Sequence, residues 1–129
     1  MTKNIFVSIA SYRDDVILKT INDLFNNSKY PSHIFLGICQ QNNVNSDKDC
    51  IYDNDNKYIN NIRVIRIPYY DAKGPVYARY LCSSLLDIKN ETYFLQIDSH
   101  TIFIKNWDEI LINMLEEIKS LGLSFLSYS

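Results

Sequence analysis

Tyr93-Phe94-Leu95-Gln96-Ile97-Asp98-Ser99-His100 is an apolar stretch that ends abruptly in three polar residues. A short run rich in aromatic and branched residues predicts a buried strand, here over 93–97. After it, apolar residues recur at helical spacing from about Trp107 to Lys119. A buried strand that leads into a helix is the unit from which parallel α/β sheets are built, so this stretch indicates the fold class.

The same alternation extends toward both ends of the chain. Apolar residues at helical spacing follow the first apolar run, with Asp14 or Asp15 as the expected N-cap. Gly74-Pro75 predicts the start of another helix. We therefore predict an α/β fold, an open and mostly parallel sheet with helices on both faces. The further strands are expected at 5–10, 34–39, 62–67 and 123–128, and the apolar face of the helix after Gly74 at Val76, Tyr77, Tyr80, Leu81, Ser84 and Leu85.

Size and charge exclude several function classes. The chain has 129 residues, 47% of them hydrophobic and 22% charged, which fits one globular domain. With a formal net charge of -2 and scattered basic residues, no nucleic-acid partner is expected. The apolar run at 5–10 is too short for a signal peptide or a membrane span, so no membrane partner is expected either.

Three cysteines lack the spacing of a metal site. Cys39 and Cys82 lie in apolar stretches, which predicts small buried residues rather than ligands. An odd number of cysteines without a disulfide pattern is typical of a reducing compartment, and we expect a cytoplasmic protein.

Polar groups follow each predicted strand. They are Ser11-Tyr12-Arg13, Gln40-Gln41, the segment 71–74 and Asp98-Ser99-His100. Ligands of open parallel sheets gather at the carboxyl ends of the strands, so these groups predict a binding site.

Asp98 and His100 are the candidate metal ligands. In an extended segment, residues two apart point the same way, so both side chains could face one ion. A carboxylate with an imidazole suits Mn²⁺ or a similar cation better than Ca²⁺. The alternative is that Asp98 caps the following turn and that His100 is an ordinary polar residue, but the position at a strand end favours a site.

Two D-x-D patterns occur elsewhere in the chain. Asp47-Lys48-Asp49 and Asp53-Asn54-Asp55 lie in a polar segment with no strand before them. We interpret both as parts of a solvated loop rather than metal sites.

Arg79 and the pair Tyr12-Arg13 are candidates for contacts with a nucleotide. Arg79 lies one turn into the helix that begins at Gly74-Pro75, a favourable place for a phosphate. A surface salt bridge explains Arg79 equally well. Tyr12 could stack on a base and Arg13 could pair with phosphate, although a polar turn after a strand explains both residues too.

Five segments, taken in order, resemble one known family. They are Phe6 to Asp14, Thr20 to Phe25, Gly37 to Gln41, Gly74 to Arg79, and Tyr93 to His100 followed by Trp107-Asp108. This order is similar to that of the peptide N-acetylglucosaminyltransferases that modify hydroxyproline in cytoplasmic acceptors. The second half also resembles the mucin-type polypeptide GalNAc transferases, where an Ala-Arg pair precedes a strand that ends in D-x-H.

The resemblance implies a GT-A fold, a UDP-sugar donor (UDP-GlcNAc), a divalent cation (Mn²⁺) and transfer to a protein hydroxyl with retention at the anomeric carbon. It implies that Asp98 and His100 hold the metal. It also implies that Ser11, Tyr12 and Arg13 line the nucleotide pocket, with Arg79 near the diphosphate. Gln40 stands where many GT-A enzymes have an aspartate that reads uracil. No residue is assigned as a general base.

The family continues well beyond this length, so residues 1–129 are expected to form the nucleotide-sugar-binding part without the acceptor half. Uncovered apolar surface would then lead to self-association or marginal stability. Two alternatives remain beside the glycosyltransferase: a non-catalytic nucleotide-sugar-binding module or transferase remnant, and an α/β domain with no ligand.

Overall fold

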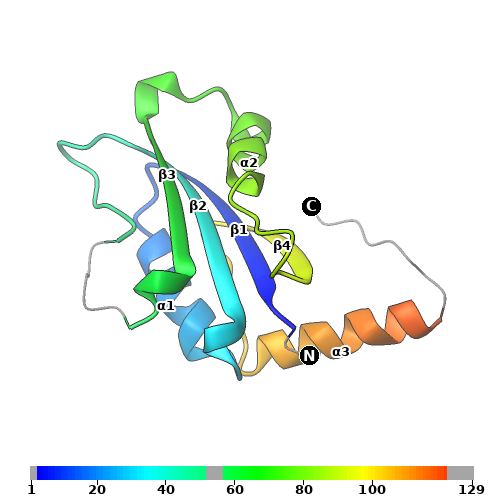
Figure 1. Cartoon of the computed structure of the whole chain (residues 1–129). Coiled ribbons are helices and arrows are strands. Elements are labelled where there is room, and N and C mark those ends of the chain that lie inside the picture. The colour runs from blue at the N-terminus through cyan, green and yellow to red at the C-terminus, as the bar shows by residue number, and fades with distance from the viewer. Residues whose placement is uncertain (1–2, 52–56, 122–129) are drawn as a thin grey trace.

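A single parallel sheet organises the computed structural model, which describes residues 3–51 and 57–121. Its strands are β1 (Ile5–Tyr12), β2 (Ile34–Asn42), β3 (Ile62–Pro68) and β4 (Tyr93–Asp98), in the order β3-β2-β1-β4. All three pairings are parallel, as Figure 1 shows. The predicted fold class is therefore confirmed, while the strand expected at 123–128 lies outside the described residues.

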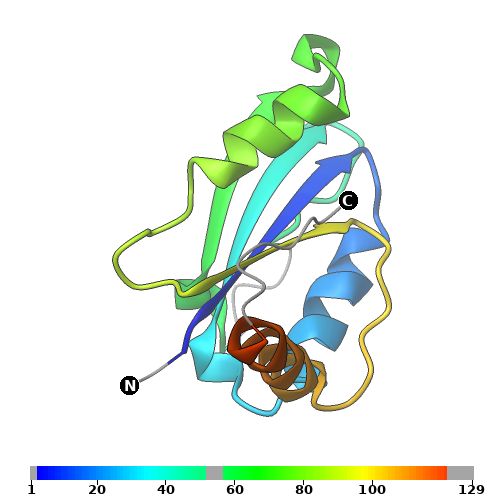
Figure 2. The ribbon, with the colours of Figure 1, turned by 90° about the vertical axis from the view of Figure 1, so that its right-hand side faces the viewer.

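Helices cover both faces of the sheet. The helices are α1 (Ile17–Asn26), α2 (Pro75–Ser83) and α3 (Trp107–Ser120), joined by the 3₁₀ turns η1 (Pro31–His33), η2 (Ile59–Asn61) and η3 (Tyr69–Asp71). In Figure 2, α2 lies on one side of the sheet and α1 and α3 lie on the other. Within the described residues, no helix is long and apolar enough to cross a membrane.

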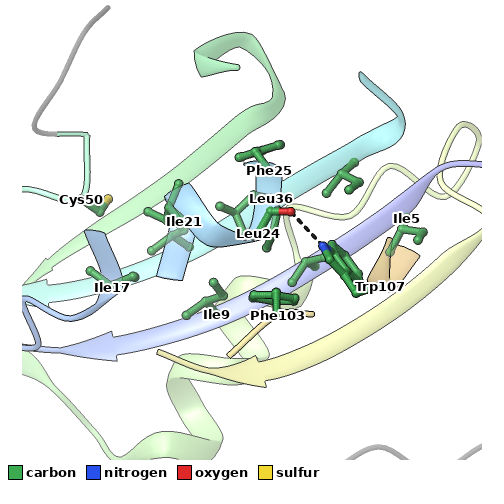
Figure 3. Close-up of a cluster of buried hydrophobic side chains, with 13 residues drawn as sticks. Ile5, Ile9, Ile17, Ile21, Leu24, Phe25, Leu36, Cys50, Phe103 and Trp107 are labelled. Atoms are coloured by element: carbon green, nitrogen blue, oxygen red, sulfur yellow. Dashed lines mark hydrogen bonds between the residues drawn. The ribbon is translucent and has the colours of Figure 1, made fainter. Parts of the chain in front are cut away.

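The main core lies between the sheet and α1. Every second residue of β1 and β2 faces it, because side chains alternate along a strand. Trp107, at the start of α3, belongs to this core as well. Its ring centroid lies 4.8 Å from that of Phe103, and its indole N–H donates to the Leu24 carbonyl (2.8 Å, Figure 3). The buried members from the strands and α1 are Ile5, Val7, Ile9, Ile34, Leu36, Ile38, Ile17, Ile21, Leu24 and Phe25.

A buried carboxylate ties α3 to the chain after α1. Asp108 is 2% exposed and accepts the backbone N–H groups of Lys29 (2.7 Å) and Tyr30 (2.9 Å). Because both donors belong to the turn that leads into η1, this carboxylate fixes the connection between α1 and β2.

The helix α2 packs more tightly on the sheet than the sequence suggests. Ala78 and Cys82 are the buried residues of this helix, and the Cys82 thiol donates toward the carbonyl oxygens of Ile9 (3.2 Å) and Gly37 (3.0 Å). The apolar face predicted from Val76, Tyr77 and Tyr80 is wrong, since these side chains are exposed. Small residues face the sheet here because helix and strands approach closely.

Candidate functional site

The loops that follow the four described strands meet at one edge of the sheet. Tyr12, Asn42, Pro68 and Asp98 end β1, β2, β3 and β4, and parallel pairing brings these ends together (Figure 1). The Arg13 backbone N–H donates to the Gln41 carbonyl (3.0 Å) and the Gln41 amide donates to the Ser11 carbonyl (3.0 Å). The predicted convergence of polar groups is thus confirmed for these loops.

The loops after β1 and β4 are joined by a chain of hydrogen bonds. Thr20, in the first turns of α1, donates to the Ser99 carbonyl (2.6 Å), and the Ser99 hydroxyl donates to Asp14 Oδ2 (2.6 Å). Asp14 Oδ1 accepts the Val16 backbone N–H (3.0 Å). Val16 holds the N-cap position of α1, so the prediction that Asp14 or Asp15 is the N-cap is wrong. Asp14 instead closes the turn before the helix and accepts a hydrogen bond from Ser99, in the loop after β4.

Asp98, at the end of β4, and Arg79, in α2, lie next to each other. The Arg79 Nη2 lies 3.8 Å from Asp98 Oδ1, and the two side chains are 41% and 65% exposed. Arg79 reaches this point because Gly74 adopts a φ of 93°, which favours glycine, and Pro75 then opens the helix. The structure thus brings together two residues that were singled out separately in the sequence.

His100 lies beyond the end of β4, in a turn. The strand ends at Asp98, and the Thr101 N–H donates to the Asp98 carbonyl (3.3 Å). The alternation that places residues two apart on one side of a strand therefore does not extend to His100. The imidazole is exposed, and its Nδ1 lies 4.0 Å from Asp14 Oδ2.

The metal pair stays a prediction. Within residues 3–51 and 57–121, no group of three or more His, Cys, Asp or Glu side chains could hold a metal ion. The chemistry of the donor set nevertheless fits Mn²⁺, because Asp98 offers a carboxylate and His100 an imidazole, both accessible at the strand ends.

Arg13 is held firmly in an unusual backbone conformation. Its φ is 49°, in the left-handed region that is uncommon for residues other than glycine. The guanidinium donates to Asp47 Oδ2 (2.9 Å) and lies 4.8 Å from the centre of the Tyr69 ring. Hydrogen bonding to Arg13 lowers the pKa of Asp47, and the same pair raises the pKa of Arg13. Tyr12 is 56% exposed next to it.

Gln40 uses both ends of its amide inside the protein. The amide nitrogen donates to Asp49 Oδ1 (2.7 Å), and the amide oxygen accepts the Cys50 N–H (2.6 Å). Arg66 binds the same Asp49 carboxylate through two hydrogen bonds of 2.8 and 2.9 Å, and this contact is the main reason why the pKa of Asp49 is lowered. Gln40 is 5% exposed. Through its hydrogen bonds to Asp49 and Cys50, it helps to hold the loop after β2 against β3.

Asp47 and Asp49 lie in the loop after β2, as predicted, but they are more than solvated loop residues. Asp47 forms an ion pair with Arg13, after β1, and Asp49 forms one with Arg66, in β3. The partners are far away in sequence, which is why local polarity alone gave no signal. Asp53 and Asp55 lie outside the described residues.

A hollow lies at the same edge, beside η3 and the start of α2. Its volume is about 560 Å³, and its lining includes Tyr70, Lys73 and Tyr77. A second hollow, of about 510 Å³, lies beside α1 and η2, and neither hollow is lined by a predicted site residue. The lining of the hollow beside α2 includes Asp71 to Lys73, from the polar segment after β3.

Comparison with known proteins identifies the family. The model of the family described as Glycosyltransferase (GlcNAc) matches residues 4–58 and 53–127. The chain belongs to this glycosyltransferase family. The matched residues include all the predicted site residues of this family member, from Ser11 to His100. No curated protein matches the chain significantly.

Proposed function

We propose that this chain binds a UDP-sugar, UDP-GlcNAc in particular, together with a divalent cation, as the donor-binding part of an enzyme that glycosylates a protein hydroxyl. The observation that carries the proposal is the meeting of Asp98, Arg79 and the loop after β1 at one edge of the sheet, in a chain of the GlcNAc glycosyltransferase family. Open parallel sheets bind ligands at this edge.

Asp98 and His100 are the residues that would hold the cation, Mn²⁺ being the ion that suits their donor atoms. When bound, the cation supplies positive charge that stabilises the departing diphosphate. Asp98 is 65% exposed on its side chain, so it can exchange its long contact with Arg79 for a metal ligand bond without unfolding the strand end.

Arg79 would bind the diphosphate. Its guanidinium is next to Asp98 and one turn from the N-terminus of α2, where helix geometry favours negative charge. The guanidinium would pair with the phosphate oxygens, which carry the charge that develops as the sugar is transferred.

The loop after β1 would bind the nucleoside. Tyr12 offers an exposed ring for stacking, Ser11 lies at the end of β1, and Arg13 is oriented by Asp47 and Tyr69. Gln40 would act through the loop that it holds, because its amide already binds Asp49 and Cys50. We further propose that the transfer to a protein hydroxyl retains the anomeric configuration and that the protein is cytoplasmic. No residue is assigned as a general base.

A calorimetric titration with UDP, in the presence and absence of Mn²⁺, tests the proposal. We expect binding that needs Mn²⁺ and that Asp98→Ala weakens at least tenfold, since loss of a ligand costs at least as much as loss of an outer-sphere partner. Asp23→Ala is the matched control, because it removes the same charge from a surface pair on α1 (Lys19 to Asp23, 3.3 Å).

Equal UDP affinity with and without Mn²⁺, or equal affinity of wild type and Asp98→Ala, would contradict the metal site. Metal-dependent binding without transfer of GlcNAc to a hydroxyl-bearing peptide would favour a binding module over an enzyme.

A further inference from the structure

The carboxylate of Asp14 joins two loops that the sequence separates by 85 residues. Its Oδ1 accepts the Val16 N–H and so closes the turn before α1. Its Oδ2 accepts the Ser99 hydroxyl at 2.6 Å and lies 4.0 Å from His100 Nδ1. One oxygen therefore serves the helix, and the other serves the loop that carries the predicted metal ligands.

The Asp14 carboxylate is well fixed at this place. Its side chain is 28% exposed, in contrast to the 67% of the His100 side chain. Ser99 is buried and is held from the other side by Thr20, whose hydroxyl donates to the Ser99 carbonyl (2.6 Å). A fixed acceptor thus lies next to an exposed imidazole.

The two nitrogens of a neutral histidine differ, since one carries the proton and the other carries the lone pair that binds a metal. Ligand histidines commonly donate their second ring N–H to a carboxylate, which sets the tautomer and the ring orientation. In this chain the carboxylate faces Nδ1. A small turn of the exposed ring brings Nδ1–H into hydrogen-bond range of Asp14 Oδ2 and leaves the Nε2 lone pair free.

We propose that Asp14 is a positioning residue for His100: its Oδ2 accepts Nδ1–H and so presents Nε2 to a divalent cation. The inference rests on the proposed function, because it assigns His100 as a metal ligand. It adds Asp14, on the loop after β1, as a partner outside the coordination sphere. Ser99 then holds the Asp14 carboxylate in place beside the loop after β4.

The role in the turn and the role at His100 can be separated. Asn is as good as Asp at accepting a backbone N–H before a helix, so Asp14→Asn keeps the bond to Val16. With its oxygen on Val16, the variant turns an amide N–H, rather than an acceptor, toward His100. Asp15→Asn is the matched control, since it makes the same change at the adjacent and exposed position.

The experiment measures the tautomer of His100 directly. The chain has two histidines, so long-range ¹⁵N–¹H spectra of labelled protein at pH 8 show His100 with His33 as internal reference. We expect the Nδ1–H tautomer for His100 in the wild type and in Asp15→Asn, and the Nε2–H tautomer in Asp14→Asn. Manganese affinity, read from the Mn²⁺ EPR signal without sugar, should fall about 10- to 100-fold in Asp14→Asn alone.

Each outcome decides a different point. Wild-type protein that binds no Mn²⁺, with or without UDP, would overturn the proposed function whatever the tautomer. Wild-type protein that binds Mn²⁺, with Asp14→Asn unchanged in both tautomer and affinity, would overturn the inference alone. Loss of affinity in Asp14→Asn with an unchanged tautomer would assign Asp14 a merely structural role and would also overturn it.

Discussion

Single carboxylates hold the loops of this protein in place. Asp108, Asp49 and Asp14 each accept hydrogen bonds from groups distant in the chain. Hydrogen bonds to a charged group are stronger than neutral ones. In addition, a buried N–H group that loses its acceptor cannot bind water instead, so the folded state loses the full desolvation free energy of that group. Substitutions at these residues should therefore affect stability more than their number of contacts suggests.

Asp108→Ala tests the buried anchor of α3. Two backbone N–H groups, of Lys29 and Tyr30, lose their acceptor, so we expect the free energy of unfolding to fall by about 2–4 kcal/mol. Urea unfolding followed by Trp107 fluorescence measures the change. Glu109→Ala, which removes only an exposed pair with Lys29, should change stability by less than about 1 kcal/mol. Equal effects of the two variants would show that burial of Asp108 does not matter.

Asp49 gives the stability a defined dependence on pH. Its pKa is lowered in the folded state, first by the Arg66 hydrogen bonds, so its contribution is complete above the unfolded pKa of about 3.9 and is lost as the pH falls through the folded pKa. We expect wild type to exceed Asp49→Asn by about 1 kcal/mol at pH 7, a modest value because the side chain is 37% exposed.

The difference should shrink below pH 4 when unfolding is measured at a series of pH values. A constant difference between wild type and Asp49→Asn down to pH 2 would contradict this assignment, because it would show that the ionised carboxylate is not what stabilises the loop.

At the scale of elements, the sheet and α2 meet where residues are small. A Cβ built at Gly37 would lie 2.4 Å from Phe6 Cζ and 3.4 Å from Leu85 Cβ. Phe6 is fully buried, so it cannot move into solvent to make room. Close packing between α2 and the middle of the sheet thus depends on glycine at this position.

Gly37→Ala should lower the free energy of unfolding by about 1–3 kcal/mol, because overpacking shifts Phe6 or α2. The double variant Phe6→Leu with Gly37→Ala should lose less than the sum of the two single changes, since the smaller side chain leaves space for the added methyl. Thermal and urea unfolding of the four proteins measure this coupling, and strictly additive losses would contradict the contact.

Local patterns predicted most of the elements. The apolar runs at 5–10, 34–39, 62–67 and 93–97 each became a strand, and the helices begin close to where spacing and Gly74-Pro75 placed them. Periodicity failed for α2, because Tyr77 and Tyr80 match an apolar pattern but lie on the outer side of a helix that needs small residues against the sheet.

The site was predicted as a set of positions rather than as a network. The strand end and the D-x-H pattern indicated Asp98 and His100, and the helix start at Gly74-Pro75 indicated Arg79. The roles of Asp14, Asp49 and Arg66 were missed, since their contacts depend on strand order, which no local pattern reveals. The GlcNAc family match supports the function more directly than any single residue does.

At the scale of the whole molecule, the cysteines report on global opening. Cys39, Cys50 and Cys82 are free and buried, and burial raises the pKa of Cys39 to about 11 and that of Cys50 to about 12. Because the thiolate is the reactive form, folded protein at pH 8 should react very slowly with a thiol reagent. All three should react in denaturant, and fast labelling of native protein would contradict this packing.

Apolar side chains of α3 are exposed in the described part of the chain. Ile110 is 43% and Met114 55% exposed, and Leu121, directly after the helix, is 71% exposed. We expect self-association that rises with concentration, because such surface is normally covered. Sedimentation velocity measures it, and Met114→Glu should shift the distribution toward the monomer; a monomer at all concentrations would contradict this expectation.

The strand order also determines when β1 can complete its pairing during synthesis on the ribosome. β1 is made first, yet its second neighbour, β4, is delivered only when most of the described chain has been translated, since Ser99 follows Asp14 by 85 residues. At about 5–20 residues per second, the nascent chain waits roughly 4–17 s with one edge of its most apolar strand unpaired. Newly made chains of this protein should therefore depend on chaperones during that interval, although the finished sheet encloses the same strand on both sides.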